Sequence, residues 1–152
     1  MLSALPLRRK PEREENASID KLAADITMGK FLDVLLLPQY EEVMQLMRFL
    51  KGSRNVAEGR LGWLGFCHNN GIYHAHTVEF VDALAEEIQK LGSGPIVEVC
   101  AGDGKLSYHL RQRNVDIKPT DNYYWGNPRR DSLLVERLSC IKALEKYNLR
   151  IV

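Results

Sequence analysis

The sequence predicts an α/β fold, with an N-terminal helical region followed by a parallel sheet. Three observations lead to this prediction. Apolar residues recur at helical spacing up to about residue 92, and from residue 95 short β-branched runs alternate with helical segments. The first of these runs ends in a glycine-bearing turn, and a helical pattern follows that turn directly.

The chain is predicted to begin with a flexible tail. This tail covers residues 1–16, where Pro6 and Pro11 interrupt a run of charged side chains. A helix is then predicted from Ser18, a favourable capping residue, to about Met28. Its expected inward face consists of apolar residues at helical spacing: Ile19, Leu22, Ala23 and Ile26.

Two further helices complete a helical cap region predicted for residues 17–92. One starts at Pro38, whose fixed φ suits a first helical turn, and ends at Gly52. Its apolar stripe is Val43, Leu46, Met47 and Leu50. The other has Thr77 as N-cap and ends at Gly92. Its apolar face is Phe80, Val81, Leu84, Ala85, Ile88 and Leu91.

Residues 52–76 are expected to lack regular structure, because five glycines interrupt them. Aromatic and imidazole side chains between those glycines suit a loop that lines a ligand cleft, and a packed linker is the alternative. The potential metal ligands here are Cys67, His68, His74 and His76. No acidic residue lies among them, and tight sites usually take ligands from spaced pairs on different elements, so no metal site is predicted.

The sheet is predicted to start with a strand over residues 96–99, followed by the turn that contains Gly102 and Gly104. After a helix to about Arg113, a second strand ends on Asp121. A third short strand is predicted over residues 133–138, and a helix then runs from a cap at Ser139 to about Tyr147. Residues 149–152 are expected to begin a fourth strand.

Composition limits the class of protein. The chain is 45% hydrophobic and 27% charged, as in ordinary globular domains, and 21 basic residues balance 20 acidic ones. Charge alone therefore gives no reason to expect a nucleic-acid or membrane partner. Cys67, Cys100 and Cys140 form no CxxC pair, and no apolar run reaches the roughly 18 residues of a membrane helix. We expect a cytoplasmic protein.

The stretch Glu98-Val-Cys-Ala-Gly102-Asp-Gly104 resembles motif I of the class I S-adenosylmethionine-dependent methyltransferases, which reads acidic-x-Gly-x-Gly-x-Gly. Asp121 matches the acidic residue that this family carries at the end of its second strand. The resemblance covers about residues 93–152 and implies a partial Rossmann-like domain. That domain would hold strands 3-2-1-4 of the family order 3-2-1-4-5-7-6, with S-adenosylmethionine as cofactor.

The resemblance also implies a role for each matching residue. Gly102 and Gly104 would border the methionine part of the cofactor, Glu98 would anchor its amino end or the loop, and Asp121 would hold the ribose. The segment that binds adenine would lie near Leu138, Ser139 and Cys140. Cys100 stands where the family has its first glycine, and Ser139-Cys140 stand where it has an acidic adenine contact.

Several alternatives stay open. The family strands after the fourth are absent, so the chain is a truncated part of a longer methyltransferase, or a partner or second copy completes its sheet, or it is a non-catalytic helical interaction module with a degenerate nucleotide-binding half-domain. A dinucleotide-binding protein is a rival, but Ser107 stands where that motif needs its third glycine. The sequence indicates neither a catalytic residue nor a methyl acceptor.

Overall fold

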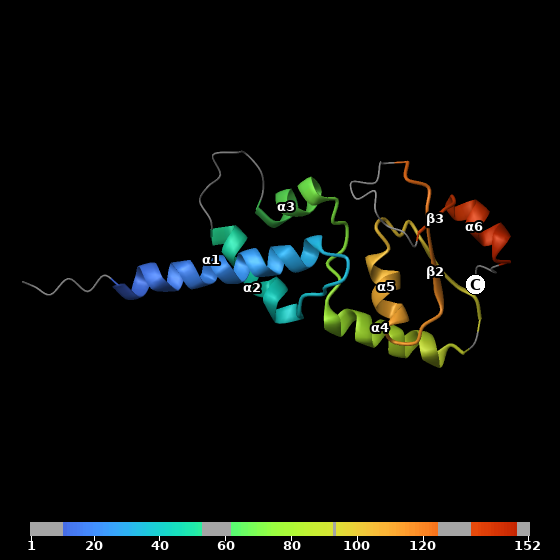
Figure 1. Ribbon diagram of the computed structural model, residues 1–152, viewed down its shortest axis with the longest axis horizontal. Coiled ribbons are helices and arrows are strands. Elements are labelled where there is room, and N and C mark those ends of the chain that lie inside the picture. The colour runs from blue at the N-terminus through green and yellow to red at the C-terminus, as the bar shows by residue number, and fades with distance from the viewer. Residues whose placement is uncertain (1–10, 53–61, 93, 125–134, 149–152) are drawn as a thin grey trace, which may run out of the picture.

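The computed structural model describes residues 11–52, 62–92, 94–124 and 135–148. Within these ranges the chain is a mixed α/β structure with six helices and a three-stranded sheet. The elements are, in order, α1 (Pro11–Leu32), α2 (Tyr40–Gly52), α3 (Gly62–Asn70), α4 (Val78–Lys90), β1 (Ile96–Val99), α5 (Lys105–Arg111), β2 (Ile117–Asp121), β3 (Glu136–Arg137) and α6 (Cys140–Lys146). Figure 1 shows α1, α2 and α3 at one end and the sheet with α4, α5 and α6 at the other.

The sheet has the order β1-β2-β3, and both strand pairs are parallel. Val99 pairs with Thr120, and Asp121 pairs with Arg137, so the carboxyl ends of all three strands meet at one edge. α5 and α6 lie on opposite faces of this sheet (Figure 1). The predicted α/β class and parallel sheet are therefore confirmed, while the predicted fourth strand at residues 149–152 lies outside the described residues.

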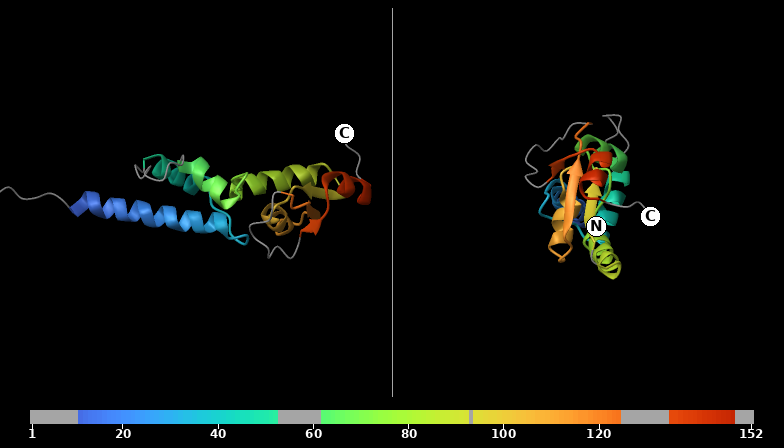
Figure 2. Two further views of the ribbon diagram at one scale, coloured as in Figure 1. Left: turned by 90° about the horizontal axis from the view of Figure 1, so that it is seen from above. Right: turned by 90° about the vertical axis from the view of Figure 1, so that its right-hand side faces the viewer.

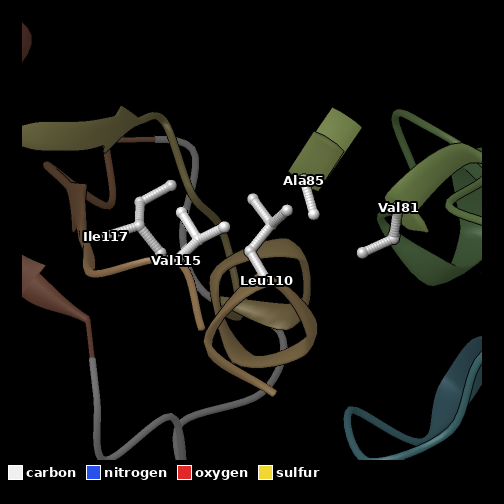
Figure 3. Packing of buried hydrophobic residues seen from close by; sticks show 5 residues of the cluster. All are labelled: Val81, Ala85, Leu110, Val115 and Ile117. Carbon is white, nitrogen blue, oxygen red and sulfur yellow. The ribbon is translucent and has the colours of Figure 1, made fainter. Parts of the chain in front are cut away.

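Five buried apolar side chains join α4, α5 and β2 into one core: Val81, Ala85, Leu110, Val115 and Ile117. Figure 3 shows Leu110 of α5 between Val115 on one side and the two α4 residues on the other. α4 belongs to the range predicted as helical cap, yet it packs in the core of the sheet. Its expected face was wrong at both ends: Phe80 and Leu91 are exposed, and Leu91 is the residue that follows the last helical turn.

A second core lies between α1, α2 and α3. Its buried members are Ala24, Phe31, Val43 and Leu46. The Phe31 ring meets Trp63 edge-on at 5.4 Å between centroids and Phe66 at 6.3 Å. α1 runs alongside the layer formed by α2 and α3 (Figure 2). The predicted absence of regular structure was thus wrong for α3, because packing of Trp63 and Phe66 on Phe31 stabilises a helix despite Gly62 and Gly65.

The prediction for α1 was wrong in its start and its face. The helix begins at Pro11, a residue favoured at the first helical position, so Ser18 lies inside it and residues 11–16 are helical. The expected inward residues Ile19, Leu22 and Ile26 are between 53% and 61% exposed. The buried side chains are instead Ala24, Thr27 and Phe31. The aromatic contacts of Phe31 fix this rotation of the helix.

The predicted N-caps Thr77 and Ser139 are confirmed, and an asparagine follows each of two helices at its C-terminal end. Thr77 caps α4 by accepting the Phe80 N–H, and Ser139 caps α6 by accepting the Lys142 N–H. Asn114 after α5 and Asn148 after α6 both adopt the left-handed backbone conformation, with φ of 62° and 51°. That conformation ends a helix and is one that asparagine tolerates.

Candidate functional site

The predicted site residues gather at the carboxyl edge of the sheet. Glu98 lies on β1, Gly102 and Gly104 lie in the turn between β1 and α5, and Asp121 is the last residue of β2. Ser139 follows β3 by two residues and starts α6. In parallel α/β sheets this edge is where ligands bind, because the loops after the strands converge there.

The turn after β1 has an unusual backbone. Three of its residues have positive φ: Cys100 at 58°, Gly102 at 59° and Gly104 at 77°. Positive φ is strained for residues with a Cβ atom, and cysteine is not among the residues that tolerate it well. A Cβ atom at Gly102 would meet nothing within 4 Å, whereas one at Gly104 would lie 2.7 Å from Cγ2 of Val135. The turn is therefore open at Gly102 and closed at Gly104.

Asp121 connects the end of β2 to this turn. Its Oδ2 accepts the Gly102 N–H at 2.9 Å, and its Oδ1 accepts the Tyr123 N–H at 2.6 Å. The Ala101 N–H donates to the Thr120 carbonyl at 3.0 Å, so the backbone fastens the turn at a second point. The sequence placed Asp121 at this edge correctly, but these two backbone donors were not foreseen.

Glu98 faces helix α5. Its Oε2 accepts the Ser107 N–H at 3.1 Å and also the Ser107 hydroxyl. Burial raises the pKa of Glu98, and the two hydrogen bonds from Ser107 oppose that shift by favouring the carboxylate. Of the two roles that the resemblance implied, these contacts correspond to anchoring the loop, because they hold the first turn of α5 against β1.

Two buried polar residues of α5 were not predicted as site residues from the sequence. Lys105 is only 6% exposed, and its Nζ donates to carbonyls at the end of α1. Nε2 of His109 lies 3.1 Å from the Val34 carbonyl. Their spacing of four residues places both on one face of α5, and that shared face was the available signal. Together they connect the helix after the glycine turn to the segment that joins α1 and α2.

The loop before α4 brings three rings together. His74 and Phe80 are 4.8 Å apart between centroids, and the His76 ring lies 4.7 Å from His74. The pKa of His76 is lowered to about 4, mainly by burial and also by the charges of His74 and Lys105, while the charge of Asp103 opposes the shift. The buried Nδ1 of His76 has no hydrogen-bond partner among the described residues. Asp103 belongs to the glycine turn, so this electrostatic coupling relates the ring group to the candidate site.

Among the residues that the structure describes, no group of three or more His, Cys, Asp or Glu side chains is placed to hold a metal ion. No helix in the described part of the chain is long and apolar enough to cross a membrane. The loop after β2 carries the aromatic residues Tyr123 and Tyr124, and Trp125, which follows them, lies outside the described residues.

Comparison with known proteins adds no relative to this description. Neither a family model, nor a curated protein, nor a solved structure matches the chain.

Proposed function

We propose that the chain binds S-adenosylmethionine at the carboxyl edge of its sheet, as the cofactor-binding part of a methyltransferase. The backbone of the glycine turn carries this proposal. The methyltransferase motif has glycine at three alternate positions, which here are Cys100, Gly102 and Gly104. All three have positive φ, so even the cysteine adopts the conformation that glycine favours.

The residues present fit such a cofactor. The open space at Gly102 allows a ligand to approach the backbone closely. A carboxylate has about four lone-pair positions, and the two N–H groups on Asp121 use one on each oxygen. Both oxygens can therefore also accept a ribose hydroxyl. When bound, S-adenosylmethionine supplies a methyl group activated by its sulfonium sulfur.

The other residues act by holding the site in shape. Glu98 fixes the start of α5 through Ser107, and Gly104 fits closely beneath Val135. Ser139 begins α6 at the end of β3, next to Leu138, whose N–H donates to the Asp121 carbonyl at 3.1 Å. We assign the adenine ring to this segment. Because methyl transfer depends mainly on alignment of the acceptor with the methyl carbon, such positioning supplies much of the catalysis.

Calorimetric titration with S-adenosylhomocysteine and S-adenosylmethionine tests the proposal. Asp121→Ala is expected to weaken binding on the order of 100-fold. It removes the two proposed charge-assisted hydrogen bonds from the ribose hydroxyls to the carboxylate, which are worth about 1.5 kcal/mol each. Asp116→Ala is the matched control. Asp116 is an exposed carboxylate that pairs with Lys118 before the other end of β2, so its removal should leave the affinity unchanged.

Three outcomes would contradict the proposal. The first is that the wild-type protein binds neither S-adenosylmethionine nor S-adenosylhomocysteine. The second is that Asp121→Ala binds them as tightly as the wild type. The third is that a nicotinamide dinucleotide binds and these two ligands do not. Circular dichroism of each variant distinguishes a lost ligand contact from a lost fold.

One observation favours a second candidate, a non-catalytic interaction module. Ile19, Leu22 and Ile26 form an exposed apolar stripe on α1, and such stripes commonly mark association surfaces. Sedimentation of wild type and of an Ile19→Lys/Ile26→Lys variant tests this role. The second candidate would be favoured if the double variant sediments with a lower mass than the wild type and the wild type binds neither S-adenosylmethionine nor S-adenosylhomocysteine.

A further inference from the structure

Lys105 occupies a special place between the candidate site and the helical end of the molecule. It directly follows Gly104 and opens α5, and its own N–H donates to Oδ1 of Asp103 at 3.1 Å. Its backbone is thus part of the glycine turn. Its side chain extends away from β1 and β2 to the C-terminal end of α1.

The ammonium of Lys105 meets three carbonyl oxygens there. The distances from Nζ are 2.6 Å to Lys30, 3.3 Å to Phe31 and 2.7 Å to Asp33. Three carbonyls match the three N–H donors of an ammonium group, and the end of a helix carries partial negative charge. The Lys105 side chain is itself almost completely buried, so this connection is not a surface ion pair.

Neighbouring contacts hold the same segment after α1 against α4 and α5. His109, one turn later in α5, reaches the Val34 carbonyl, and the Val78 N–H of α4 donates to the Pro38 carbonyl at 3.0 Å. The Tyr40 N–H at the start of α2 donates to Oε2 of Glu79 at 2.8 Å. The segment from Asp33 to Gln39 is therefore held by α4 and α5, and Lys105 is the member of this set that adjoins the glycine turn.

We propose that Lys105 is a positioning residue that couples ligand binding at the glycine turn to the position of the helical pair α1–α2. A ligand that fixes the backbone of the turn also fixes the Cα atom of Lys105 and, through its ammonium, the end of α1. Coupling between two sites is reciprocal, so order at the end of α1 in turn favours the bound form of the turn. This inference rests on the proposed ligand site.

Hydrogen exchange of the full chain with and without S-adenosylhomocysteine tests the coupling. The amides of Asp33, Leu35 and Leu36 are suitable reporters, because all three are hydrogen-bonded next to the Lys105 contact. The Asp33 N–H donates to the Gly29 carbonyl of α1, and the Leu35 and Leu36 N–H groups donate to Asp33. In wild type the ligand is expected to slow their exchange at least about threefold. Lys105→Met should abolish this protection and weaken binding about 5- to 150-fold, the usual range of coupling between sites.

Lys118→Met is the matched control, since it removes an exposed lysine from β2, and it should behave as wild type. Should Lys105→Met fail to fold, the wild-type exchange measurement alone decides. Ligand binding without protection of these amides overturns the coupling and leaves the proposed function intact. No binding to wild type overturns both. A variant that melts earlier but keeps wild-type affinity and protection would show Lys105 to be merely structural.

Discussion

Gly104→Ala is expected to lower the free energy of unfolding by about 2–5 kcal/mol. The left-handed conformation of this residue, with φ of 77°, costs a residue with a Cβ atom about 1–2 kcal/mol. The new Cβ would also lie 2.7 Å from Cγ2 of Val135, and such overpacking costs about 1–3 kcal/mol because valine has little rotamer freedom. Urea denaturation followed by circular dichroism measures the change.

Gly102→Ala separates the two causes. Gly102 has a similar φ of 59°, but its Cβ would meet nothing within 4 Å, so only the backbone strain of about 1–2 kcal/mol is expected. Val135→Ala should in turn relieve much of the Gly104→Ala penalty, since it removes the methyl group in question. Equal costs at Gly102 and Gly104, or no relief by Val135→Ala, would refute the steric explanation.

These glycines illustrate what local sequence could predict. The β-branched run at residues 96–99, the glycines after it and the caps Thr77 and Ser139 all act within a few residues of their own position. These features could therefore be predicted without knowledge of distant contacts, and the strand, the turn and the two caps lie where they were expected. Asp121 was also located correctly, because the end of a strand fixes the edge on which it lies.

Features that depend on distant partners were not predictable in the same way. α1 has two faces that could be buried, and the more apolar one, Ile19, Leu22 and Ile26, remains exposed. The choice depends on Trp63 and Phe66, which lie more than 30 residues after Phe31. The contact of Lys105 with the carbonyl of Lys30 at the end of α1 spans 75 residues along the chain. No periodicity within either segment contains that information.

The free energy of unfolding is expected to fall as the pH is lowered from about 6.5 to about 4, and His76 should contribute about 3 kcal/mol of that loss. In the unfolded chain His76 takes up a proton near its ordinary pKa of 6.5, whereas burial lowers its pKa in the folded protein to about 4. Between these values the unfolded state binds more protons, so the stability that the neutral imidazole provides is complete above pH 6.5 and is lost towards pH 4.

Other titratable groups also contribute to the pH dependence of the free energy of unfolding. A variant is therefore needed to isolate the contribution of His76. Burial lowers the pKa of His109, which adds a loss of the same sign, and burial raises the pKa of Glu98, whose contribution has the opposite sign. His76→Leu should therefore flatten the pH dependence by about 3 kcal/mol between pH 6.5 and pH 4 without removing it. At pH 7 its stability should equal or exceed that of wild type, because Nδ1 of His76 is buried with no hydrogen-bond partner among the described residues.

Urea denaturation at a series of pH values measures this difference. His68→Leu is the control, since it removes an exposed imidazole from the neighbouring helix α3. An unchanged slope in His76→Leu would mean that water reaches the His76 ring, and the ring group of His74, His76 and Phe80 would then be solvated. A flattened slope would place a neutral, desolvated imidazole within the electrostatic reach of the glycine turn, because Asp103 and Lys105 act on the same ring.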